Sequence, residues 1–111
     1  MVTLADLNRH FLTLCAEEEV DVQWCESPLK ALALSGELEF ILAPHITSEA
    51  AYAVAMHELG HIKSRNQSGE QIERERAAWD WARSNALSWT AHMEGYATAS
   101  LRSYEGQRSA C

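Results

Sequence analysis

The residues His57-Glu58-Leu59-Gly60-His61 decide how the rest of this 111-residue chain is interpreted. They lie within a segment whose apolar residues recur at helical spacing, and the expected helix runs from about Ser48 to Ser64. Side chains four residues apart on a helix project from the same face, about one turn from each other. The two histidines are therefore expected to lie close enough together to bind one metal ion.

The spacing His-Glu-x-x-His is a signature of zinc peptidases. Zinc bound by imidazoles and a carboxylate makes a water molecule acidic enough to supply hydroxide near neutral pH. Glu58 follows the first histidine and is expected to reach that water and take its proton. We predict that His57 and His61 bind Zn²⁺ and that Glu58 is the catalytic general base; the alternative is that Glu58 is a solvated helix carboxylate.

A catalytic zinc ion commonly has three protein ligands, so the two histidines need a third partner. The other histidines are His10, His45 and His92. The extended motif with a third histidine is absent, because Ser64 and Gln67 occupy its glycine and histidine positions. The third ligand is therefore expected on a different element, and a glutamate on the next helix is the best candidate.

The segment 73–82, Glu-Arg-Glu-Arg-Ala-Ala-Trp-Asp-Trp-Ala, resembles the downstream motif of the zincin-type metallopeptidases of the ImmA/IrrE group. Glu75, Ala78, Trp81 and Ala82 match the pattern of that family. The resemblance implies that Glu75 is the third zinc ligand, with Glu73 as the other possibility. It also implies that the small Ala78 lets this helix approach the histidine helix closely, and the tryptophan-rich version looks like a compact phage- or prophage-associated variant.

The resemblance covers about Leu38 to Ala82. In proteins of this kind, the strand before the active-site helix often lies at the edge of the cleft and pairs with an extended substrate. By resemblance, residues 37–42 are expected to form that strand here. The chain departs from the family at Trp79, where an asparagine or aspartate is common, and in the missing Leu-Leu-x-Pro ending after Ala82.

The pattern of the whole chain predicts the α+β class, with helices before and after a small sheet. We expect one zincin-like minimal domain over residues 1–111, in which a small antiparallel or mixed sheet packs on the histidine helix and the glutamate helix. The expected elements are a helix over 4–18, a strand over 20–24, two strands over 31–34 and 37–43, and helices over 48–64, from 70 to about 85 and from about 87, followed by a frayed tail from 105.

Two details of the expected sheet can be tested against the structure. Ser35-Gly36 is a plausible turn between the second and third strands. In the third strand Leu38, Phe40 and Leu42 alternate with Glu37, Glu39 and Ile41, so that one face is expected to be buried.

Composition limits the partners of the protein. Nine Lys and Arg against sixteen Asp and Glu give a net charge of -7, which argues against nonspecific binding to nucleic acid or to an anionic membrane. Cys15, Cys25 and Cys111 are an odd number without CxxC spacing, so we expect reduced thiols in a cytoplasmic protein. Neither a signal peptide nor a stretch of about 18 apolar residues is present in this sequence.

Two functions are consistent with these residues. The first is a zinc metallopeptidase that hydrolyses a specific protein or peptide partner, since a chain of this size leaves only a shallow cleft. The second is a non-catalytic protein-interaction module that zinc stabilises. His92 and Tyr96 could donate hydrogen bonds to the oxyanion of a tetrahedral intermediate in peptide hydrolysis. The simpler interpretation is that both are ordinary packed or exposed side chains.

Overall fold

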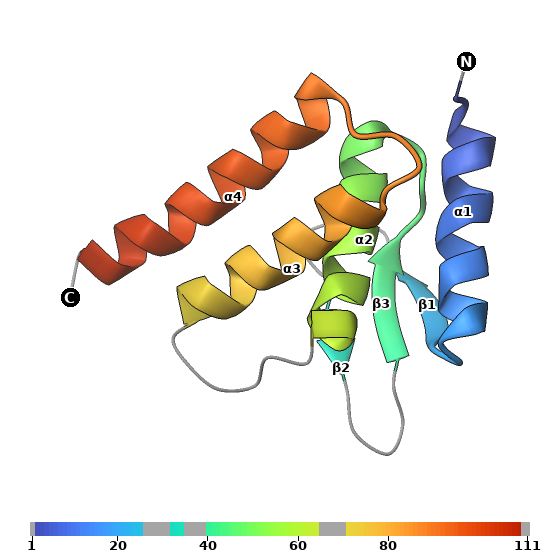
Figure 1. Cartoon of the computed structure of the whole chain (residues 1–111), viewed down its shortest axis with the longest axis horizontal. Coiled ribbons are helices and arrows are strands. Elements are labelled where there is room, and N and C mark those ends of the chain that lie inside the picture. The colour runs from blue at the N-terminus through green and yellow to red at the C-terminus, as the bar shows by residue number, and fades with distance from the viewer. Residues whose placement is uncertain (1, 26–31, 35–39, 65–70, 110–111) are drawn as a thin grey trace.

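The computed structural model describes residues 2–25, 32–34, 40–64 and 71–109. Figure 1 shows a small sheet and four helices within these residues, which confirms the α+β class. In chain order the elements are α1 (Leu4–Glu17), β1 (Asp21–Cys25), β2 (Leu32–Leu34), β3 (Phe40–Pro44), α2 (Glu49–Ser64), α3 (Gln71–Asn85) and α4 (Ala91–Ser109).

The sheet has the strand order β1-β3-β2. β2 pairs antiparallel with β3, as expected of a hairpin, although the expected turn at residues 35–36 lies outside the described residues. β1 pairs parallel with β3, with Val22 opposite Ile41, so the sheet is mixed. The sheet was expected to be antiparallel or mixed, and the antiparallel alternative is wrong. β1 lies against β3, the second strand of the hairpin, and the two strands run in the same direction.

The central position of β3 corrects one expectation, and burial shows which face of the strand meets the core. Its backbone pairs with β1 on one side and β2 on the other, so the described residues of the predicted substrate-pairing strand, 40–42, have no free edge for a peptide. Ile41 and Ala43 are completely buried whereas Leu42 is half-buried, so the face that contains Leu42 is not the core face. The helices cover the opposite face, and the sequence pattern did not show which face that would be.

α1 begins with a reciprocal cap. The Thr3 hydroxyl accepts a hydrogen bond from the Asp6 N–H, and the Asp6 carboxylate accepts one from the Thr3 N–H. Such a capping box satisfies two N–H groups that the helix itself leaves unpaired. One side of α1 then buries Leu7, Phe11 and Cys15.

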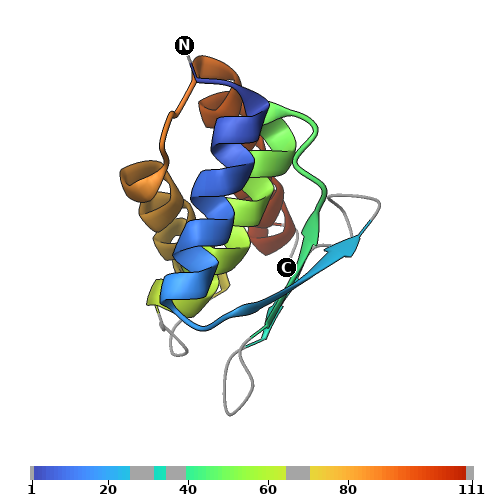
Figure 2. The ribbon, with the colours of Figure 1, turned by 90° about the vertical axis from the view of Figure 1, so that its right-hand side faces the viewer.

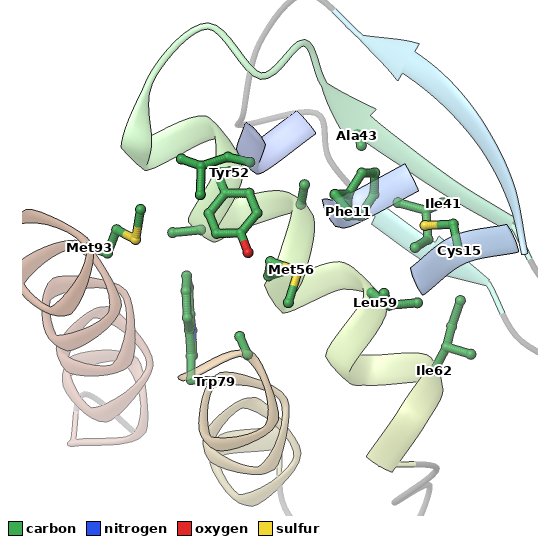
Figure 3. Packing of buried hydrophobic residues seen from close by; sticks show 14 of the residues in the cluster. Phe11, Cys15, Ile41, Ala43, Tyr52, Met56, Leu59, Ile62, Trp79 and Met93 are labelled. Carbon is green, nitrogen blue, oxygen red and sulfur yellow. The ribbon is translucent and has the colours of Figure 1, made fainter. Parts of the chain in front are cut away.

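α2 is the central helix of the molecule. Its first turn is capped by the Ser48 hydroxyl, which accepts a hydrogen bond from the Ala51 N–H. Every residue from Ala51 to Gly60 is buried, because α2 contacts the sheet, α1, α3 and α4. Figure 2 shows the helices gathered on one side of the sheet. Figure 3 shows the resulting core, in which side chains of α2 meet α1 and β3 on one side and α3 and α4 on the other.

The start of α4 differs from the prediction. The helix begins at Ala91 instead of near residue 87, and the preceding residues make other contacts: the Leu87 N–H donates to the Tyr52 hydroxyl, and the Trp89 indole donates to Glu94. The Thr90 hydroxyl accepts a hydrogen bond from the Met93 N–H and so caps the helix.

The end of α4 also differs, since the helix continues to Ser109 where a frayed tail from residue 105 was expected. Near its start, α4 is tied to α3 by the Arg83 guanidinium, which donates to both carboxylate oxygens of Glu94 at 2.7 and 3.1 Å. None of the described helices is long and apolar enough to cross a membrane.

Candidate metal centre

Two helices bring three potential ligands together. α2 carries His57 and His61 on one face, and α3 carries Glu75. Oε2 of Glu75 lies 2.5 Å from Nε2 of His57 and 3.2 Å from Nε2 of His61. The candidate ligand atoms of the three residues all lie within 4.8 Å of one another. This is the set of residues that the sequence and the family resemblance predicted for a metal.

The close approach of α2 and α3 depends on Gly60. A Cβ atom placed on Gly60 would lie 2.4 Å from the carbonyl oxygen of Ala78, well inside van der Waals contact. The absence of a side chain at Gly60 therefore lets the backbone of α3 pass directly over α2. Because Ala78 is three residues after Glu75, this contact also determines how near Glu75 comes to the histidines.

Burial and charge make this a tightly coupled group. His57 and Glu75 are each only 7% exposed. Burial lowers the pKa of His57, but the carboxylates of Glu58 and Glu75 outweigh it and raise that pKa to about 9. Burial raises the pKa of Glu75, but hydrogen bonds from His57 and His61 outweigh it and lower that pKa to about 2. The metal-free chain therefore holds an ion pair between the imidazolium of His57 and the carboxylate of Glu75.

Glu58 is also buried, and its position is informative. Its Oε1 lies 3.3 Å from Nδ1 of His57, whereas Glu75 faces Nε2 of the same ring. The two carboxylates thus lie at different nitrogens of one imidazole. A carboxylate at the nitrogen opposite the ligand atom is a common way of orienting a histidine that binds a metal.

The other candidate residues lie outside the group. Glu73 is exposed on α3, so the structure brings Glu75 and not Glu73 to the histidines. His92 is exposed on α4, and His45 is exposed and stacked on Trp24 with ring centroids 5.2 Å apart. His10 is half-buried, and its Nδ1 lies 2.9 Å from the hydroxyl of Tyr52.

One neighbour of the site was not expected from the sequence. Trp79, at which the chain departs from the family pattern, is buried, and its indole stacks on the imidazole of His57. The spacing of four residues from Glu75 placed both side chains on one face of α3, and that was the available signal. Tyr96 of α4 is half-buried and its ring lies against this indole, with its centroid 6.2 Å from that of Trp79.

The donor set suits a divalent metal. Two imidazole nitrogens and one carboxylate oxygen are the ligands of many catalytic zinc sites, and they also accept other divalent ions of the first transition series. Both Nε2 atoms converge on one carboxylate oxygen, so that after loss of their protons both would face a shared region. The residues therefore fit a metal ion that replaces the protons of this group.

Comparisons of the chain with protein-family models, with curated proteins and with solved structures gave no match. The likeness to the ImmA/IrrE group therefore rests on the residues of the two motifs.

Proposed function

We propose that this chain is a zinc-dependent metallopeptidase of the zincin type that hydrolyses a peptide bond in a specific protein partner. The observation that carries the proposal is the convergence of His57, His61 and Glu75, which come from two helices and are joined around one carboxylate oxygen. A bound Zn²⁺ ion would supply Lewis acidity, which makes water acidic near neutral pH and polarises a peptide carbonyl group.

In this proposal the protein residues divide the work. His57 and His61 hold the metal through Nε2, and Glu75 holds it through its carboxylate. The Glu58 carboxylate, which lies beside His57 on α2, takes a proton from the attacking water and passes it to the nitrogen of the leaving amine.

Charge and composition support the partner and the compartment that we propose. A net charge of -7 is consistent with a protein substrate and unfavourable for nucleic acid. Cys15 is a free thiol, which is consistent with the cytoplasm. A phage or prophage origin is proposed from the family resemblance alone.

A second candidate is a non-catalytic interaction module in which the same ion joins α2 to α3. The contact between Glu58 and Nδ1 of His57 favours this candidate, because in that position the carboxylate orients a ligand instead of facing a substrate.

The first test is metal content. We expect one zinc ion per wild-type chain after dialysis without chelator, loss of the ion in Glu75→Ala, and retention in Glu73→Ala, whose exposed residue makes a matched control. A folded wild-type chain that takes up no divalent ion would overturn the proposal.

The second test separates the two candidates. Zinc-loaded wild type and Glu58→Gln are incubated with a mixture of unstructured peptides, and new peptide termini are identified by mass spectrometry. Cleavage by the wild type that disappears in Glu58→Gln and after chelation, while Glu58→Gln keeps its zinc, supports the enzyme. If the wild type binds metal but cleaves neither these peptides nor host proteins in a lysate, the result supports the interaction module.

A further inference from the structure

The indole of Trp79 covers one face of the His57 ring. Their ring centroids are 4.2 Å apart and their planes differ by 16°, so the two rings lie nearly parallel. Trp79 is 1% exposed and lies one helical turn after Glu75. One face of α3 therefore supplies both the carboxylate at Nε2 of His57 and the surface against which the imidazole rests.

The indole is itself held in place by aromatic neighbours. Its centroid lies 6.4 Å from that of Trp89 and 6.2 Å from that of Tyr96, at interplanar angles of 63° and 56°. Edge-to-face and tilted pairs of this kind are favourable arrangements of aromatic rings and stabilise the position of the indole. In Figure 3 Trp79 projects from α3 into the space between α2 and α4, where Met93 lies beside it. The surface behind His57 is thus rigid.

This rigidity matters because the backbone does not determine the plane of an imidazole. Rotation about the terminal torsion of a histidine is broad, so the direction of the Nε2 lone pair depends on the surroundings. For His57 the indole covers a ring face and Glu58 lies at Nδ1, which leaves Nε2 directed at Glu75. His61 has less support: its side chain is 26% exposed, and it meets the His57 ring edge-on at 4.5 Å.

A second observation concerns the indole nitrogen. Nε1 of Trp79 is buried and has no hydrogen-bond partner among the described residues. An unpaired buried donor is destabilising, and a phenylalanine at this position would avoid that cost. Hydrophobic packing alone therefore does not favour tryptophan here. A tryptophan face does offer the strongest attraction for a positively charged group, and an imidazole that is bound to a cation is such a group.

We propose that Trp79 is a positioning residue of the metal centre, which holds the His57 ring in the orientation that binds the ion and stabilises its positive charge. The inference rests on the proposed metal site and names a residue outside its ligand set. It applies to the catalytic and to the non-catalytic candidate, since both need the ion to be held.

The test compares one pair of substitutions at two neighbouring tryptophans. Trp79→Phe keeps a smaller aromatic face and Trp79→Met keeps apolar volume without one. Trp89→Phe and Trp89→Met are the matched controls, because Trp89 packs against Trp79 and has no ring contact with His57 in the described part of the chain. Affinity for Co²⁺ is measured against a competing chelator, and the visible absorption of bound Co²⁺ reports the arrangement of its ligands. Thermal unfolding in chelator measures the loss of stability that is independent of metal.

We expect affinity to fall in the order wild type, Trp79→Phe, Trp79→Met, with the last about 10–100-fold weaker, as for other residues that orient a ligand. The Co²⁺ spectrum should change in Trp79→Met, whereas both Trp89 variants, which keep the Trp79 indole against His57, should lose clearly less affinity than the Trp79 variant with the same substitution. Wild-type affinity in Trp79→Met, or an equal loss in Trp89→Met, would overturn the inference. If Trp79→Met does not fold, the comparison of Trp79→Phe with Trp89→Phe decides in the same way. A wild type that binds no Co²⁺ overturns the metal site as well, whereas metal binding that is insensitive to Trp79 overturns this inference alone.

Discussion

Replacing Gly60 by alanine should damage both the fold and the proposed metal centre, although alanine is the better helix former. The added Cβ atom would lie 2.4 Å from the Ala78 carbonyl oxygen and 3.1 Å from its Cα. Ordinary contact begins near 3.4 Å, so α3 would have to move away from α2 by about 1 Å. The atoms that it meets belong to the backbone, so no side-chain rotation can relieve the contact.

The magnitude follows from two opposing terms. Alanine in place of glycine within a helix gains up to about 1 kcal/mol, whereas an overpacked core contact costs about 1–3 kcal/mol and more when backbone must move. We expect a net loss of about 1–2 kcal/mol in the free energy of unfolding. For a domain of this size, a loss of 1 kcal/mol corresponds to roughly 4–8 °C in Tm. Zinc affinity should fall as well, because Glu75 moves with α3.

Gly95 provides the control. It lies within α4, and a Cβ atom added there would meet nothing within 4 Å. Gly95→Ala should therefore raise stability by up to about 1 kcal/mol and leave zinc affinity unchanged. Urea unfolding in chelator and zinc titration of both variants form the assay. A Gly60→Ala variant as stable as Gly95→Ala, with unaltered zinc affinity, would refute the close approach of α2 and α3.

Three further outcomes are expected. In chelator, the raised pKa of His57 contributes stability that is full below pH 6.5 and is lost as the pH rises through about 9. The lowered pKa of Glu75 contributes stability that is full above pH 4.5 and is lost as the pH falls through about 2. The urea midpoint should therefore be highest between pH 4.5 and 6.5, and a midpoint that keeps rising through pH 9 would contradict the ion pair. Burial raises the pKa of Cys15 to about 12, so this thiol should be alkylated only as fast as the chain unfolds. Mass spectrometry after iodoacetamide treatment checks this rate, with a short peptide that contains the same cysteine as the control. Arg83→Met should lower the free energy of unfolding by about 1 kcal/mol through loss of the paired hydrogen bonds to Glu94, and an unchanged urea midpoint would show that the solvent-exposed pair contributes nothing.

Local patterns predicted the helices well. The helical spacing of apolar residues placed α1 and α2 within one residue of their starts, which Thr3 and Ser48 cap in the structure. The start of α4 was missed, and in the segment before it the Leu87 N–H donates to the Tyr52 hydroxyl of α2, a partner that the local pattern does not reveal. Contacts with other elements therefore overrode propensity at this helix start.

The strands were predicted less completely. Three short strands can be ordered in several ways, and the choice depends on which face the helices cover. The sequence offered Leu42 and Ile41 as equally apolar alternatives, and only the position of the helices selects Ile41 for the core. The order β1-β3-β2 likewise depends on long-range pairing, which removed the edge expected for a substrate on β3.

The candidate site divides in the same way. By itself the sequence determined that His57 and His61 share one helix face, because the period of the helix requires it. Only the tertiary structure decided that Glu75 and not Glu73 meets them, that Glu58 lies at Nδ1 of His57, and that Trp79 lies against its ring. The physical reason is that these contacts depend on the rotation of α3 and its distance from α2. Both are determined by the packing of Gly60 on Ala78, two residues that lie eighteen positions apart in the chain.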